Sequence, residues 1–345
     1  MNYYTSYDSI LKLYDSNNRM FSYKANSELE HKDWSLLFRQ KLKDLLGLKQ
    51  LKAVALTCNL VESVTMDAYV REKYVLQTEE NVWMPFYKLI PKQVDKEFIP
   101  VIALHGHGAY GKEGVAGTVT KGIERVINYN TDYGVSLVKK GFIVFCPDAR
   151  GSGERRELLN QGDSIERQLE SSCNSLNFTL ISLGLSLTSV WVWDLMRLID
   201  YIMDLPNCKI NELSVIGFSG GGNLSLWLSA LDERVKKTII SGYYHSYRGS
   251  ILRSNQCGCN FVPNLYRFAD LGDIGALIAP RKLYIESGDC DPLNGEDGIR
   301  DVLGQVDITK RAYETLNVPH HLIHRIHTGG HKFYGENVEF FLRDF

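Results

Sequence analysis

The chain has 345 residues, a formal net charge of −2 and 23% charged residues, which is the composition of an ordinary globular protein. It carries no basic run, so we expect neither nucleic acid nor an anionic membrane surface as a partner. Its first residues have neither the basic nor the apolar segment of a secretory signal, and its seven cysteines are scattered. Both features favour free thiols and a cytoplasmic location.

The N-terminal part of the chain is predicted to be a helical extension, residues 1–50, packed on a catalytic body of residues 51–345. Asp33 is the expected N-cap of a helix that Gly47 terminates. Its apolar stripe comprises Trp34, Leu37, Phe38, Leu42, Leu45 and Leu46. Between Leu60 and Ile90, alternating apolar and polar residues predict two leading antiparallel strands.

From Ile99 onward, short continuous apolar runs alternate with helical segments, which is typical of a mostly parallel, doubly wound α/β sheet with helices on both faces. The expected strands are Pro100 to Leu104, Phe142 to Cys146, Leu213 to Gly217, Lys237 to Ser241, Lys282 to Glu286 and His321 to Ile326. The expected helices are Tyr133 to Lys140, Thr188 to Leu205, Gly220 to Leu231, Ile308 to Leu316 and Glu336 to Phe345. In such sheets the chemistry gathers beyond the carboxyl ends of the strands.

An uncharged run from Leu176 to Trp193 is long enough to raise the question of a membrane span. Its many Ser, Thr and Asn residues argue against a span. Asp194, Arg197 and Asp200 follow at helical spacing, so we interpret the second half as an amphipathic helix packed on the core. No membrane association is therefore expected.

The segment from Leu213 to Gly222 ends an apolar strand on a serine set among glycines. Gly217 and Gly221 lack a Cβ, which allows the strand to fold back sharply into a helix and leaves the Ser219 hydroxyl exposed. The N–H of Gly220 is then free at the helix N-terminus, where an anion is favoured. By itself this pattern is also compatible with a plain turn.

Two other strand ends carry polar residues. The first ends in His105-Gly-His-Gly108 and the second in Pro147-Asp-Ala-Arg-Gly-Ser-Gly-Glu154. Asp148 and Arg150 could shape the pocket floor, contact a polar substrate or hold their own loop by pairing, and we favour the structural role. Polar insertions at about 155–177 and 243–272 are expected to form the rim of the pocket.

Ser219, Asp291 and His331 are each placed at the end of a predicted strand, and together they have the residue types of a nucleophile, an orienting carboxylate and a general base. Alternative roles remain for each: Asp291 could cap a turn before Pro292, and His331 could belong to a histidine-rich tail with His320, His321, His324 and His327. Those histidines do not share one face and lack acidic or thiol neighbours. Cys257-Gly-Cys259 would also need more ligands to bind zinc. We therefore expect no metal and no cofactor.

These motifs resemble the α/β-hydrolase family from about Ile99 to Phe345, and most closely its dienelactone-hydrolase and acetyl-xylan-esterase branch. The likeness rests on His105-Gly-His-Gly108, Asp148-x-Arg-Gly-x-Gly153, Gly217-Phe-Ser-Gly-Gly-Gly222 and Ala279-Pro-Arg281 with Gly288-x-x-Asp291. The resemblance implies a nucleophile elbow at Ser219 and an oxyanion hole made of the His107 and Gly220 N–H groups. It also implies that Asp291, three residues after Gly288, is the triad acid in place of Asp289.

The resemblance implies a serine esterase that acts on a small-molecule ester, with a small acyl group on a polar or sugar-like alcohol. Dienelactone hydrolase has a cysteine where this chain has Ser219, which points away from enol-lactone chemistry. A serine peptidase of the same fold and a non-catalytic binding protein are the alternatives. A peptidase is less expected because no propeller-length segment precedes Ile99. The sequence does not specify an oligomeric state.

Overall fold

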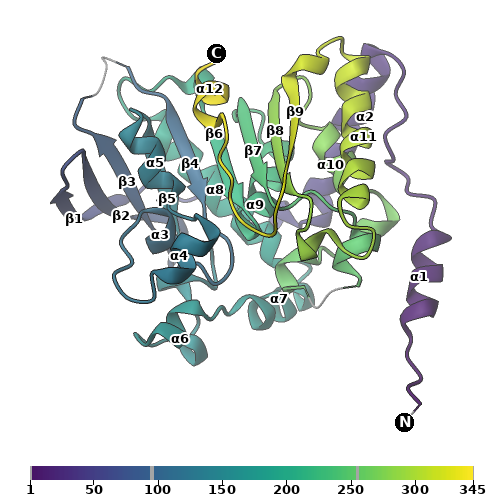
Figure 1. Cartoon of the computed structure of the whole chain (residues 1–345), viewed down its shortest axis with the longest axis horizontal. Helices are drawn as coiled ribbons and strands as arrows, with labels where there is room; N and C mark the ends of the chain where they lie inside the picture. The colour runs from purple at the N-terminus through teal and green to yellow at the C-terminus, as the bar shows by residue number, and fades with distance from the viewer. Residues whose placement is uncertain (1, 94–96, 254–255, 345) are drawn as a thin grey trace.

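A nine-stranded sheet crosses the molecule in the order β1-β2-β3-β5-β4-β6-β7-β8-β9 (Figure 1). The computed structural model describes residues 2–93, 97–253 and 256–344. Phe345, the expected end of the last helix, and positions 254–255 of the second insertion lie outside the described residues. The strands are β1 Cys58–Thr65, β2 Tyr69–Glu79, β3 Val82–Pro91, β4 Pro100–Leu104, β5 Ile143–Pro147, β6 Ser214–Phe218, β7 Lys237–Ser241, β8 Lys282–Gly288 and β9 Leu322–His327.

The sheet has an antiparallel edge and a parallel body. The pairings of β1 with β2, β2 with β3 and β3 with β5 are antiparallel, whereas every pairing from β5 through β4 to β9 is parallel. Three leading strands are present, so the expectation of two was wrong. Asn81, in the left-handed conformation with φ 62°, makes the tight turn between β2 and β3. The alternation of polar and apolar residues in the sequence does not by itself show where this turn lies.

Helices cover both faces of the sheet, as the strand pattern predicts. The helices are α1 Tyr7–Asp15, α2 Glu28–Leu45, α3 Lys112–Val115, α4 Glu124–Tyr129, α5 Tyr133–Lys139, α6 Ile165–Leu169, α7 Cys173–Ser182, α8 Leu187–Met203, α9 Gly220–Leu231, α10 Leu271–Ala276, α11 Ile299–Thr315 and α12 Val338–Arg343. Ile102 and Leu104 point into one core with α2, α8, α9, α10 and α11. Val101 and Ala103 point into the opposite core with α5 and α12.

The predicted parallel strands agree with the structure to within a residue or two. Strands β4, β5, β6 and β7 are buried along their whole length, whereas the edge strand β9 is partly exposed. Helix α11 begins at Ile299, well before the predicted Ile308. Short helices inside the insertions, including α6 and α7, were not predicted. They lie beyond one end of the sheet in Figure 1.

Helix α2 departs from its predicted start. It begins at Glu28 and its N-cap is Ser27, whose hydroxyl accepts from the N–H of Glu30, so the assignment of Asp33 as N-cap was wrong. Leu37 was also wrongly placed on the apolar stripe, since 62% of it is exposed. Phe38, Leu42 and Leu46 do enter the core, and Gly47 follows with φ 63°, as a helix terminator does.

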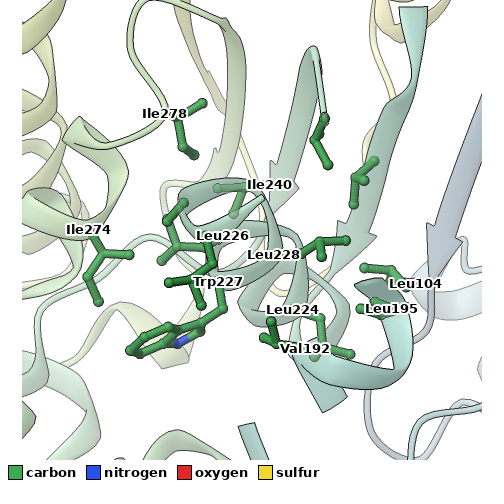
Figure 2. Packing of buried hydrophobic residues seen from close by; sticks show 14 of the residues in the cluster. Leu104, Val192, Leu195, Leu224, Leu226, Trp227, Leu228, Ile240, Ile274 and Ile278 are labelled. Atoms are coloured by element: carbon green, nitrogen blue, oxygen red, sulfur yellow. The ribbon is translucent and has the colours of Figure 1, made fainter. Parts of the chain in front are cut away.

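Helix α9 is surrounded on all sides. All its residues are buried, and Figure 2 shows its leucines and Trp227 between sheet residues such as Leu104 and Ile240 and residues of α8 and α10 such as Val192 and Ile274. A helix that is apolar all round has to be central. The turn before α9 is therefore held against motion by the packing of the helix that follows it.

In the described part of the chain, no single helix has both the length and the apolarity to cross a membrane; α7 and α8 reach that threshold only as a pair bent by 98°.

We predict that Leu228→Ala, at the centre of α9, lowers the free energy of unfolding by about 2–5 kcal/mol, because it leaves a cavity in a fully buried site. Leu36→Ala on α2 is the matched control: Leu36 is 67% exposed, and its removal is expected to change stability by less than about 0.5 kcal/mol. Denaturant titration of both variants measures the difference. Equal losses in the two variants would contradict the central role of α9.

Candidate active site

Ser219 stands at a sharp reversal between β6 and α9. Its backbone has φ 56° and ψ −119°, a region that non-glycine residues rarely occupy. A Cβ on Gly217 would lie 2.1 Å from the Gly221 carbonyl oxygen, and a Cβ on Gly221 would lie 1.9 Å from the Leu104 carbonyl oxygen. Glycine is therefore required at both positions, as the sequence pattern predicts.

The loop after β4 lies directly against this reversal. A Cβ on Gly106 would be 3.2 Å from the Ser219 Cβ, and a Cβ on Gly220 would be 2.7 Å from the His107 Nδ1. In the described chain, the N–H groups of His107 and Gly220 donate to no protein acceptor. Two unpaired N–H groups beside one serine have the chemistry of an anion-stabilising pair.

His331 is held by a buried carboxylate. Its Nδ1 lies 2.7 Å from Asp291 Oδ2, while Asp291 Oδ1 accepts from the N–H of Leu293 at 2.9 Å. The neighbouring Asp289 has a different partner, the N–H of Gly329 at 2.9 Å. Of the two carboxylates, the one that contacts the imidazole is Asp291.

A second buried carboxylate holds the loop that carries His331. Glu286, at the end of β8, accepts hydrogen bonds from the N–H groups of Tyr334 and Gly335, both at 3.0 Å, and from the Ser241 hydroxyl at 2.6 Å. Burial raises the pKa of Glu286, and these bonds oppose the rise. The loop is thereby tied to the centre of the sheet.

Ser219 and His331 line the same cleft, which has a volume of about 280 Å³. The Phe218 ring lies 4.5 Å from the His331 ring, centroid to centroid, and forms part of its wall. The other lining residues are Gly106, His107, Ala109, Arg125, Tyr129, Thr131, Gln256, Cys257 and Leu293. The second predicted insertion thus contributes Gln256 and Cys257 to the rim.

Asp148 and Arg150 lie outside this cleft, in buried ion-pair networks. Asp148 accepts from Lys112 Nζ at 2.9 Å and from the Lys112 N–H at 2.7 Å, and neither side chain is exposed. Arg150 donates to both oxygens of Asp194, each at 2.8 Å. Burial raises the pKa of Asp194, but Arg155 and Arg150 outweigh it and bring the pKa to about 2. These contacts favour the structural interpretation of both residues.

His105 connects the ends of two strands. Its Nε2 accepts from the N–H of Ala149 at 3.0 Å, so the proton of the neutral ring is on Nδ1, which lies 3.0 Å from the Gly106 carbonyl oxygen. Burial lowers the pKa of His105, more strongly than Asp148 raises it. A neutral His105 thus stabilises the start of the His107 loop.

Sequence reasoning missed two features of the site. Arg125 and Tyr129 enter the cleft from α4, a short helix with no periodicity by which to find it. His107 and Cys173 come beside Cys257 and Cys259, although they are distant in the chain. The argument that zinc would lack ligands at Cys257-Gly-Cys259 is therefore wrong, since the fold brings two further candidate ligands there, His107 and Cys173.

Comparison with known proteins places the chain among hydrolases. The model described as the Abhydrolase family matches residues 3–337. A Bacillus subtilis (strain 168) protein that bears the name of a hydrolase, YtaP, is 23% identical over 244 residues, which are 70% of this chain and 73% of that protein.

Solved structures share the fold. A Bacteroides fragilis structure described as an acetyl xylan esterase has a TM-score of 0.78 at 16% identity, with 94% of this chain and 83% of that one covered. A glucuronoyl esterase from Solibacter usitatus has a TM-score of 0.63 at 15% identity, covering 90% and 92%. The predicted α/β-hydrolase fold is thereby confirmed.

His245, buried beside the Asp291 and His331 pair, makes stability depend on pH. Burial lowers its pKa to about 4, whereas an unfolded histidine titrates near 6.5. Below that value the unfolded chain takes up a proton that the folded chain refuses, so stability is lost as pH falls from about 6.5 to 4. We predict that this loss is smaller by about 2.5 kcal/mol in His245→Phe, measured by denaturant titration at pH 8 and pH 4.5. An unchanged pH dependence in the variant would contradict the assignment.

Proposed function

The chain belongs to the Abhydrolase family, and we propose that it is a serine hydrolase that cleaves carboxylic esters through an acyl-enzyme. Ser219 is the proposed nucleophile, His331 the general base and Asp291 the carboxylate that orients it. The observation that carries the proposal is the 2.7 Å contact between His331 Nδ1 and Asp291 in the cleft that Ser219 lines. It supports an imidazole whose free Nε2 can accept a proton.

In the proposed mechanism, His331 takes the Ser219 proton as the hydroxyl attacks the ester carbonyl. The N–H groups of Gly220 and His107 stabilise the oxyanion, and α9 adds the positive end of its dipole. His331 then protonates the leaving alcohol. Water repeats the cycle on the acyl-enzyme, releasing the acid and restoring the hydroxyl. No step requires a metal ion or a cofactor.

The cleft supports a small substrate. Its 280 Å³ lies just under the roughly 300–1,000 Å³ of typical ligand pockets, which favours a short acyl group. Arg125 stacks over the Tyr129 ring, 5.2 Å from its centroid, and it forms no ion pair with a described carboxylate. Its guanidinium is thus available for a polar or sugar-like alcohol. Structural neighbours named as acetyl xylan and glucuronoyl esterases fit this choice.

A peptidase and a non-catalytic binding protein are the rival functions. An activity screen on p-nitrophenyl esters of increasing chain length, acetylated sugars and peptide amides distinguishes both from an esterase. We expect hydrolysis of acetyl esters, falling as the acyl chain lengthens. Amide cleavage without ester cleavage would favour the peptidase, and no turnover of any substrate would favour the binding protein. The cytoplasmic location stays a prediction.

We predict that Ser219→Ala lowers the rate of ester hydrolysis by roughly 10⁴–10⁶ without loss of the fold, because one oxygen is removed from a turn that faces the cleft. A fluorophosphonate probe should label the native protein and leave the variant unlabelled. Circular dichroism is the control for folding. A folded variant with near-native activity would show that another residue is the nucleophile.

The two carboxylates after β8 offer a matched pair of variants. We predict that Asp291→Asn lowers kcat by roughly 10³–10⁴, since it removes the carboxylate that fixes the His331 tautomer. Asp289→Asn should cost at most about tenfold, because Asp289 bonds to the N–H of Gly329 in place of the His331 ring. Steady-state kinetics on an acetyl ester compares them. The reverse ranking would transfer the role to Asp289.

A further inference from the structure

Four metal-ligating side chains from three distant segments meet beside the catalytic cleft. His107 follows β4, Cys173 begins α7, and Cys257 and Cys259 flank a short turn in the second insertion. His107 Nε2 lies 3.5 Å from Cys173 Sγ and 3.4 Å from Cys259 Sγ. The ligand atoms of His107, Cys173 and Cys257 all lie within 4.8 Å of one another. Cys173 and Cys259 are buried.

Hydrogen bonding between neutral groups does not account for this arrangement. The Nε2 of a neutral imidazole has either one lone pair or one hydrogen, so it serves a single partner. Two sulfur atoms nevertheless lie at contact distance from it, and a third sulfur is close by. A single cation at the centre would engage the lone pairs of all four groups at once.

The two nitrogen-to-sulfur distances fit tetrahedral coordination. With zinc to sulfur bonds of about 2.3 Å and a zinc to nitrogen bond of about 2.0 Å, a tetrahedral site separates nitrogen and sulfur by about 3.5 Å and two sulfurs by about 3.8 Å. The two nitrogen to sulfur distances here are 3.5 and 3.4 Å. Three thiolates and one imidazole form a donor set that selects zinc over calcium or magnesium.

We propose that His107, Cys173, Cys257 and Cys259 bind one zinc ion in a closed structural site. Each thiol gives up its proton to solvent as the ion binds. The chain supplies all four ligands, which leaves no position for a reactive water, and the site therefore stabilises structure without taking part in the ester chemistry.

The surroundings provide the outer hydrogen bonds that thiolate sites use. The Asn260 side-chain amide reaches Cys259 Sγ at 3.7 Å and the Cys257 carbonyl at 3.0 Å, and its own oxygen accepts from the Tyr243 hydroxyl at 2.6 Å. Asn174 accepts from the N–H of Gly258 at 2.7 Å, which joins α7 to the cysteine turn. Such bonds orient ligands and stabilise the charge on sulfur.

The proposed ion would connect three parts of the cleft. It would fix the His107 loop, and with it one N–H of the proposed oxyanion hole, to α7 and to the insertion that lines the rim. This consequence rests on the proposed function. The zinc site itself does not, because metal binding is measured without any substrate.

The test is the zinc content of the full chain, purified under reducing conditions without chelator from zinc-supplemented medium and measured by inductively coupled plasma mass spectrometry. We expect about one zinc per wild-type chain and at least about a fivefold loss in Cys173→Ser and in Cys257→Ser. Cys208→Ser is the matched control, since Cys208 is half-buried and outside the cluster, and it should keep about one zinc.

Cobalt provides a second measurement if the buried Cys173→Ser fails to fold. Wild-type protein loaded with Co²⁺ should show thiolate-to-metal charge transfer and the strong visible bands of tetrahedral cobalt, and Cys257→Ser should weaken both.

Wild-type protein that retains no zinc after reconstitution and desalting would overturn the proposal, as would equal zinc in the wild type and Cys257→Ser. Mass spectrometry that finds a disulfide between two of the cluster cysteines in the metal-free wild-type protein would also contradict the zinc site. The cluster would then be assigned to redox chemistry.

Discussion

The steric limit at the reversal between β6 and α9 is the constraint on which the rest of the site depends. Ser219 keeps a backbone conformation that costs free energy, on the order of 1–3 kcal/mol for such residues. It persists because Gly217 and Gly221 allow backbone atoms to touch and because α9 is buried on every side. The packing of an entire helix thus fixes the direction of one hydroxyl group.

Buried charged side chains fix the positions of the loops around Ser219. Asp148 with Lys112, Asp194 with Arg150 and Arg155, and Glu286 with two backbone N–H groups each hold a segment that leaves a strand end. Removing one partner would leave an uncompensated charge in the interior, which is far more costly than the loss of a surface pair. Rigid loops are what a preorganised site requires, since its donors must already be in position when charge develops.

The rim of the cleft is built differently from its floor. The floor is made of strand ends and backbone, whereas the rim comes from α4 and from the second insertion, which has little regular structure. Segments of this kind need crosslinks of their own to hold a shape. A cluster of three sulfurs and one imidazole lies where α7, the second insertion and the His107 loop meet.

The sequence by itself determined the alternation of buried strands and helices, the sharp turn at Ser219 and the strand-end placement of Asp291 and His331. These are local properties: apolar periodicity, glycine at fixed offsets and polar residues where a strand stops. Only the tertiary structure decided that Asp291 contacts His331 while Asp289 binds its own loop, and that Arg150 pairs with Asp194. Likewise, only the fold brought His107 and Cys173 to Cys257 and Cys259. Those contacts join residues far apart in the chain through segments that lack periodicity, so their partners depend on the path of the backbone in space.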